Sequence, residues 1–194
     1  RADDFSTFTL RLIEDMPILQ HLRPQDNQRN SKIAFDVGPA PASHAPSVTS
    51  KGITSQITGA RSDLIVADDI ESLNNSATSA MRDKLSESIK EFDAVLKPNG
   101  NIIYLGTPQT EQSIYNVLPE RGYDICIWPA RVPDAKKAIA YGNKLAPVVA
   151  SRIDSEPSET NSPTDPHRFN EFDLQEREAS YGRTGFALQF MLDT

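Results

Sequence analysis

Apolar residues in the middle of the chain form two short unbroken runs, at residues 64–67 and 102–105. A run of this length without a polar break is typical of a strand that is buried on both faces of a parallel sheet. Between the runs, apolar residues recur at helical spacing from 77 to 96, and Pro98-Asn99-Gly100 predicts the end of that helix. The three segments predict a strand–helix–strand unit, whose right-handed crossover places both strand ends at one edge of the sheet.

The remaining pattern predicts further elements around this unit. Residues 3–22 carry a helical stripe that Pro17 should kink or end, and we expect this helix to pack on a sheet. The stretches 39–46 and 151–168 lack an apolar period and predict exposed loops. The other predicted elements are strands at 31–38, 47–57 and 123–128, a short helix at 111–118, and two helices within 172–192 that glycines separate.

Two adjacent carboxylates, Asp68 and Asp69, follow the first unbroken run directly. In open α/β sheets, ligands bind outside the carboxyl ends of the strands. One carboxylate there can hold Mg²⁺ directly or through a water, and its neighbour can orient an attacking water. The alternative is a solvated strand end that leads into a helix cap, because Asp is common at such turns. This segment by itself leaves both interpretations open.

Three other groups of residues are candidates for chemistry. Gly106-Thr107-Pro108 ends the second unbroken run and predicts a turn with its hydroxyl at the same sheet edge, although a plain turn is the alternative. Arg61 precedes the first run and could reach a phosphate, or it could be an ordinary surface residue. The histidines, His21, His44 and His167, lie far apart in the sequence and show no metal-ligand spacing.

Composition narrows the class of protein. The chain has 194 residues, of which 38% are hydrophobic and 24% charged, which predicts a folded domain and not a disordered chain. A net charge of −7 argues against a nucleic-acid-binding surface that covers the whole chain, but it allows a local basic groove. The single cysteine, Cys126, forms no internal disulfide, and we expect it to be a small core residue in a reducing compartment. No apolar run has the length of about 20 residues that spans a bilayer, and there is no signal peptide.

Several stretches together resemble one family. These are Thr58-Gly59-Ala60-Arg61-Ser62-Asp63 leading into residues 64–71, Gly106-Thr107-Pro108, Trp128-Pro129-Ala130, Pro163-Thr164-Asp165-Pro166 with Arg168-Phe169, and the segment 186–192. In this order they resemble the ATPase half of the large terminase subunit of tailed bacteriophages, particularly the DNA maturase B type of short-tailed phages. The similarity is spread over most of the chain, and none of the motifs would be sufficient by itself.

The resemblance implies an α/β fold, a three-layer P-loop NTPase-like domain with a mostly parallel central sheet that is incomplete at its N-terminus. Residues 1–150 would form an ATPase core, and residues 151–194 an exposed loop and a helical segment leading toward a nuclease domain. No G-x-x-x-x-G-K-[ST] motif occurs in the sequence, so we expect the phosphate-binding loop to precede Arg1 in a longer protein. The chain alone should then bind ATP poorly and hydrolyse it negligibly.

The resemblance also implies roles for single residues, with ATP and Mg²⁺ as cofactors. Asp68 would be the Walker B residue that holds Mg²⁺. The family usually has Glu at the next position to orient the water, and here that role would fall to Asp69 or, as a substitute, Glu71. Gly106 and Thr107 would sense the nucleotide, and Arg61 would contact a phosphate.

The implied protein is a motor that couples ATP hydrolysis to DNA movement into a capsid. Its partners would be double-stranded DNA, the portal protein, the small terminase subunit and further copies of itself in a ring, in the cytoplasm of the infected bacterial host and without a membrane. One alternative is another P-loop ATPase of helicase type, but the further Arg-containing motifs that a helicase should show after Pro108 are not found. The other alternative is a non-catalytic α/β binding module, which the abrupt ends of the chain disfavour.

Overall fold

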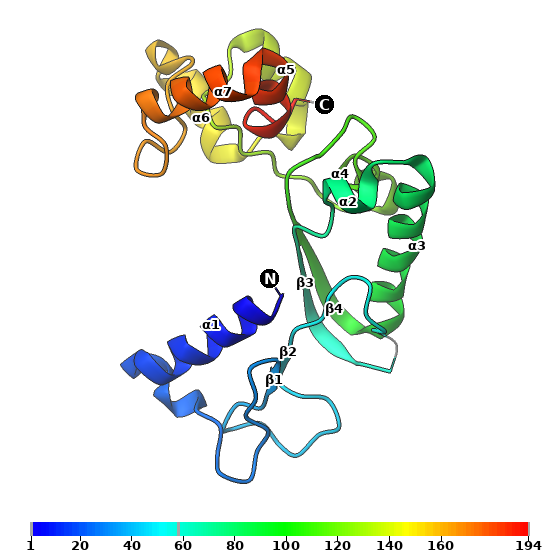
Figure 1. Ribbon diagram of the computed structural model, residues 1–194. Coiled ribbons are helices and arrows are strands. Elements are labelled where there is room, and N and C mark those ends of the chain that lie inside the picture. Colours follow the sequence, from blue (N-terminus) through cyan, green and yellow to red (C-terminus); the bar gives the residue numbers. More distant parts are fainter. Residues whose placement is uncertain (1, 58, 194) are drawn as a thin grey trace. The chain divides into compact units, whose positions relative to one another are not determined.

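The computed structural model describes residues 2–57 and 59–193. Contacts divide the chain into two compact units, the first made of Arg1–Val66 with Glu87–Ile103 and the second of Ala67–Ser86 with Tyr104–Thr194. The predicted boundary at residue 150 falls inside the second unit. In chain order the elements are α1 (Ala2–Asp15), η1 (Pro17–Leu22), β1 (Ala34–Phe35), β2 (Val48–Thr49), β3 (Ser62–Asp68), α2 (Leu73–Ser76), α3 (Ser79–Val95), β4 (Leu96–Leu105), α4 (Ile114–Val117), η2 (Leu118–Arg121), α5 (Ala135–Tyr141), η3 (Gly142–Lys144), α6 (Pro147–Ser155), η4 (Pro157–Glu159) and α7 (Glu171–Gln189) (Figure 1).

Helix α1 ends at Asp15, and Pro17 opens the 3₁₀ turn η1, so the predicted helix and its end are confirmed. Its packing differs from the prediction. Ser6 is fully buried and donates a hydrogen bond to Lys32 O (2.5 Å), with Ser50 Oγ also 3.1 Å from its hydroxyl, whereas Phe5 and Phe8 of the apolar stripe are exposed. The helix therefore meets its neighbours through a small polar residue and through Ile13, which is buried, while the part of its apolar stripe at Phe5 and Phe8 is open to solvent.

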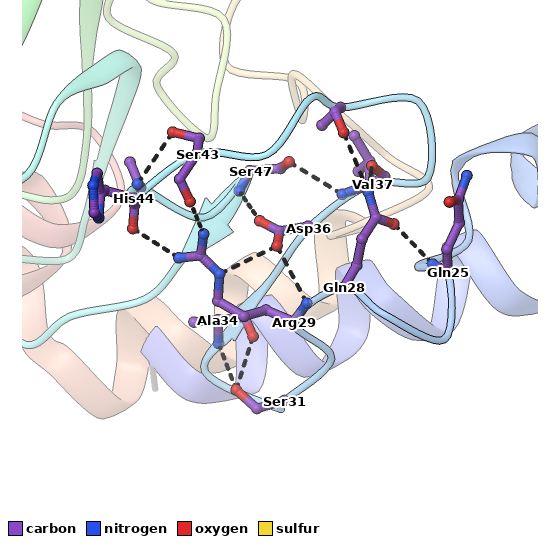
Figure 2. Close-up of polar contacts among 12 residues, drawn as sticks. Gln25, Gln28, Arg29, Ser31, Ala34, Asp36, Val37, Ser43, His44 and Ser47 are labelled. Atoms are coloured by element: carbon purple, nitrogen blue, oxygen red, sulfur yellow. Dashed lines mark hydrogen bonds and ion pairs between the residues drawn. The ribbon is translucent and has the colours of Figure 1, made fainter.

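The strands predicted at 31–38 and 47–57 shrink to two residues each. β1 and β2 pair antiparallel, with Ala34 opposite Thr49 and Phe35 opposite Val48. The intervening residues 36–47 do not continue the ladder, because side chains bind their backbone groups instead: Gln28 and Arg29 donate to carbonyls between Val37 and His44 (Figure 2). The alternating pattern correctly predicts two strands here, but it overestimates the length of each.

The predicted strand–helix–strand unit is confirmed. β3 and β4 form a two-stranded sheet, in which the strands run parallel and α3 makes the connection (Figure 1). The helix buries most of its apolar stripe, namely Leu85, Ile89, Phe92 and Val95, whereas Met81 near its start is exposed. It ends at Val95, where β4 begins at once, so Pro98-Asn99-Gly100 lies within the strand and does not end the helix. A Cβ at Gly100 would lie 2.9 Å from Asp63 O, which explains the glycine where β4 passes close to β3.

The prediction that both strands are buried on both faces is wrong. In β3, Ala67 is 3% exposed while its neighbour Val66 is 42% exposed, and Leu64 is also exposed. Ile103 and Leu105 of β4 are exposed in the same alternating way. Successive side chains of a strand point to opposite faces, so one face of this pair is packed and the other is open within the residues that the structure describes.

Elements after β4 follow the predictions in part. The short helix appears as α4 followed by η2, and α7 bends at Gly182 (φ 68°), which confirms two helical segments at the glycines. The strand predicted at 123–128 is wrong, because only Ile127 makes a bridge, to Leu145. Cys126 is exposed and is not a core residue. The start of the predicted 151–168 loop is helical, since α6 continues to Ser155. Among the residues with described coordinates, no helix is long and apolar enough to cross a membrane.

Candidate functional site

The carboxylate pair, Asp68 and Asp69, lies where β3 ends. Asp68 is the last residue of the strand and shares the open face with Val66, so its carboxylate is exposed. Asp69 turns the chain with φ 46°, a left-handed conformation that Asp tolerates better than most residues. Its backbone N–H donates to Leu105 O over 2.9 Å. This bond holds the chain just after the first strand against the last residue of β4.

The Gly-Thr-Pro turn, residues 106–108, follows directly from Leu105. The Asp69–Leu105 bond therefore places this turn at the same sheet edge as the carboxylate pair, as the sequence predicts. A Cβ at Gly106 would overlap the hydroxyl and ring of Tyr115, so only glycine fits without displacing that side chain. Gln109 closes the turn, because its side-chain amide donates to Thr107 O (3.1 Å).

Tyr115 packs between the loop that follows β3 and the Gly-Thr-Pro turn that follows β4. Its hydroxyl donates to Leu105 O over 3.3 Å. Burial raises the pKa of the Tyr115 phenol to about 12, and the neighbouring charges of Asp69 and Glu71 act in the same direction. The phenol therefore stays protonated at neutral pH and acts as a hydrogen-bond donor.

Glu71 has an unexpected place in this arrangement. Its side chain is only 3% exposed, and both of its oxygens accept hydrogen bonds. Oε1 accepts from the backbone N–H of Gln109 (3.1 Å), and Oε2 accepts from Ser113 Oγ (2.9 Å) and from the backbone N–H of Ile114 (2.7 Å). Ser113 is the N-cap of α4 and Ile114 its first residue, so Glu71 and the cap together satisfy donors at the start of that helix.

Arg61 is not brought to the carboxylate pair. It precedes the first residue of β3, whereas Asp68 is the last, so the two residues lie at opposite ends of one strand. Its guanidinium donates to the carbonyls of Ala60 (2.9 Å) and Ala94 (3.5 Å), the second near the end of α3. The phosphate contact predicted for Arg61 stays a prediction that this geometry does not support.

Sequence reasoning missed the residues that join the two loops. Gln109, Ser113 and Tyr115 had no assigned role, and neither did Arg82, which donates to Ser76 O (2.8 Å) and to the side chain of Gln112. Ser113 was the one residue with a usable signal, because a Ser before a short apolar helix is a common N-cap. The contacts of Glu71 with backbone N–H groups could not be predicted from residue types, because nearly every residue carries such a group.

No group of three or more His, Cys, Asp or Glu side chains that could hold a metal ion occurs among residues 2–57 and 59–193. The exposed carboxylate of Asp68 nevertheless fits Mg²⁺, since this ion usually takes one or two protein carboxylates and completes its shell with water and substrate phosphates.

A cavity of about 300 Å³ lies in the first unit, remote in sequence from these residues. It is lined by Gln25, Asn27, Gln28, Arg29, Asp36, Gly38, Ala40, Pro41, Ala42 and Ser43. Figure 2 shows that the polar side chains here bind the protein's own loop: Arg29 pairs with Asp36 (3.2 Å) and donates to His44 O (2.8 Å). We therefore interpret the cavity as the space between this loop and the polar side chains that hold it in place.

No family model matches the chain. The chain is 48% identical to the terminase large subunit of Enterobacteria phage T3, over an alignment of 198 residues that includes 100% of this chain. It spans only 34% of the length of that relative. The resemblance that the motifs indicated is thus confirmed: over its whole length, the chain is related to the large terminase subunit of a tailed bacteriophage.

Proposed function

We propose that the chain is part of the ATPase of a phage DNA-packaging motor, within a longer protein that we call the full-length protein. The observation that carries this proposal is the carboxylate pair at the end of β3, tied to the Gly-Thr-Pro turn through Asp69 N–H and Leu105 O (2.9 Å). The relationship to the T3 subunit supports it. That relative supports neither a helicase nor a non-catalytic binding module.

In this proposal Asp68 holds Mg²⁺ together with ATP, and Asp69 orients the attacking water. When bound, Mg²⁺ supplies neutralisation of the charge that develops on the transferring phosphoryl group. Asp69 is one methylene shorter than the Glu expected at this position, and its backbone is left-handed (φ 46°). Thr107 lies at the same edge and is within the segment that would follow the state of the nucleotide.

We further propose the three-layer P-loop NTPase-like fold for the full-length protein. The open face of β3 and β4 supports it, because a parallel sheet is ordinarily covered on both faces. The phosphate-binding loop would come from a segment outside this sequence, which contains no G-x-x-x-x-G-K-[ST]. Double-stranded DNA, the portal protein, the small terminase subunit and a homo-oligomeric ring in the host cytoplasm are the proposed partners and setting.

The test is ATP turnover by the full-length protein with Asp68→Asn and Asp69→Asn. We expect each substitution to lower kcat by at least about 100-fold, the range typical of lost electrostatic or general-base groups. Asp63→Asn is the matched control, because it makes the same chemical change in the same strand, at an exposed residue whose 2.7 Å ion pair with Lys97 is of small energetic value. Turnover that survives Asp68→Asn would refute the proposal.

The chain by itself provides a second test. Without a phosphate-binding loop it should show negligible Mg²⁺-dependent ATP turnover. Clear turnover by the purified chain, abolished by Asp68→Ala, would contradict this expectation.

A further inference from the structure

Glu71 is a charged side chain that the proposed reaction does not explain. It is 3% exposed, and its partners all come from one short stretch, residues 109–114, which we call the post-turn segment. A buried carboxylate is unfavourable unless hydrogen bonds compensate it, and here charge-assisted bonds from two backbone N–H groups and one hydroxyl do so.

The post-turn segment is continuous with the Gly-Thr-Pro turn. Gln109 takes part in both, because its backbone N–H donates to Glu71 Oε1 (3.1 Å) and its side chain donates to Thr107 O (3.1 Å). Glu71 follows Asp68 by three residues. The two ends of the site are thus tied twice, once through Asp69 N–H to Leu105 O and once through Glu71 to Gln109, Ser113 and Ile114.

The carboxylate is specific to this arrangement. Three donors converge on two oxygens that both accept. A glutamine has one acceptor oxygen, so its amide N–H₂ would face either Gln109 N–H or Ile114 N–H. Since Oε2 has two donors, glutamine is expected to keep its oxygen there and to lose the bond to Gln109. Glu71→Gln therefore releases the turn while it leaves the start of α4 capped.

We propose that Glu71 is a positioning residue, which sets the place of the Gly-Thr-Pro turn relative to the carboxylate pair, and that it is not the group that orients water. This inference rests on the proposed ATPase function. The positioning role implies that the carboxylate pair and the Gly-Thr-Pro turn move together as one rigid body. A nucleotide-driven displacement at either loop is then passed to the other through Glu71.

The experiment uses the full-length protein with Glu71→Gln. We expect kcat to fall about 10- to 100-fold, with the KM for ATP and the number of nucleotide-binding sites per protein unchanged within about twofold. In hydrogen exchange, the amide of Gln109 should lose at least about tenfold protection. Glu111→Gln is the matched control, since Glu111 is an exposed carboxylate in the same segment, and it should leave both readouts unchanged.

Each contrary outcome has a defined meaning. A loss of binding sites with unchanged kcat per site indicates a merely structural role and overturns the inference. So does Glu71→Gln with full activity and normal protection while Asp68→Asn is inactive. Inactivity of Glu71→Gln alongside an active Asp69→Asn assigns the water to Glu71 and also overturns it. If Asp68→Asn stays active, the proposed function fails. Hydrogen exchange at the Gln109 amide then still shows whether Glu71 holds the Gly-Thr-Pro turn in place.

Discussion

Two irregular segments of this protein are each held in shape by polar side chains, but with opposite polarity. In the second unit, one carboxylate, Glu71, accepts from N–H groups of the post-turn segment. In the first unit, Gln28 and Arg29 donate to carbonyls of the loop between Val37 and His44 (Figure 2). The first contact is buried, at 3% exposure, whereas the Arg29 side chain is 40% exposed.

The comparison shows why similar numbers of hydrogen bonds contribute different free energies of stabilisation in the two segments. Water can replace the partners of an exposed guanidinium when a bond breaks, so such a bond contributes little net free energy. Two of the partners of Glu71, Ser113 and Ile114, are buried, and losing the carboxylate leaves their donors unsatisfied. We therefore expect the Glu71 contact to control global stability and the Arg29 contact to control only its own loop.

The largest effect should come from Glu71→Ala. It leaves the N–H of Ile114 and the hydroxyl of Ser113 without their buried acceptor, at about 1–3 kcal/mol for each group. We expect the free energy of unfolding to fall by about 3–5 kcal/mol, measured by urea denaturation followed by circular dichroism. Glu111→Ala, at an exposed carboxylate, should change it by less than about 0.5 kcal/mol. Equal effects of the two substitutions would remove the distinction between buried and exposed anchors.

Gly106→Ala should have an intermediate effect of about 1–3 kcal/mol, because the added methyl group forces Tyr115 away from Leu105 O. Displacement exposes the phenol, so its pKa should fall from about 12 toward the ordinary value near 10. Ultraviolet titration of tyrosine ionisation measures this change. Gly52→Ala is the control, since a Cβ there meets only Ser55 Oγ at an ordinary 3.4 Å. An unshifted titration would show that Tyr115 is not held by this contact.

Arg29→Ala should lower the free energy of unfolding by only about 1 kcal/mol, because its partners become accessible to water. Its local effect should be larger: proteolysis within residues 39–46 should accelerate several-fold, as measured by limited digestion and mass spectrometry. Arg29→Lys should not restore resistance, because an ammonium cannot span Asp36, Ser43 O and His44 O together. Arg11→Ala, at an exposed helix position, is the control. A large global loss for Arg29→Ala would contradict the comparison.

The smallest effect is expected at Glu171, which is a carboxylate acceptor like Glu71 but is exposed like Arg29. Hydrogen bonds from Arg131 (2.6 and 3.0 Å) hold the pKa of the Glu171 carboxyl below its usual range. A lowered folded-state pKa gives stability that is complete above the unfolded value of about 4.3 and is lost as pH falls through the folded value. Glu171 is half exposed, so screening limits this contribution to less than about 1 kcal/mol.

The measurement is the difference in thermal midpoint between the wild-type chain and Glu171→Gln. It should be present at pH 6 and should shrink as the pH falls below about 4. Glu178→Gln, at an exposed position of the same helix, should show no such difference. A difference that grows on acidification would have the wrong sign for a depressed pKa.

The strand–helix–strand unit could be predicted because its signal is periodic and local. The extent of its burial could not. An unbroken apolar run such as residues 64–67 looks the same whether one face or both faces of the strand are packed, since a pattern records side chains and not their neighbours. The strand predicted at 123–128 failed for a related reason: alternation is present, but within residues 2–57 and 59–193 its only ladder partner is the isolated bridge from Ile127 to Leu145.

The site was predictable at one end only. A pair of Asp residues after an apolar run indicates a strand end, and the topology then places the Gly-Thr-Pro turn beside it. Glu71 was visible as a residue, but its partners are mainly the main-chain N–H groups of Gln109 and Ile114, which carry no side-chain identity. A role that depends on backbone donors of a segment 38 residues away emerges only from the fold.

The open face of β3 and β4 also has a calorimetric consequence. Heat capacity rises on unfolding because apolar surface becomes hydrated, and Leu64, Val66, Ile103 and Leu105 are already about half exposed in the folded chain. They add less to that increment than packed side chains would, so its value per residue should lie below the ordinary range of about 12–15 cal/mol/K. The curve of stability against temperature is then flatter, and warming or cooling from its maximum changes the free energy of unfolding less than in a chain of the same length with both faces packed.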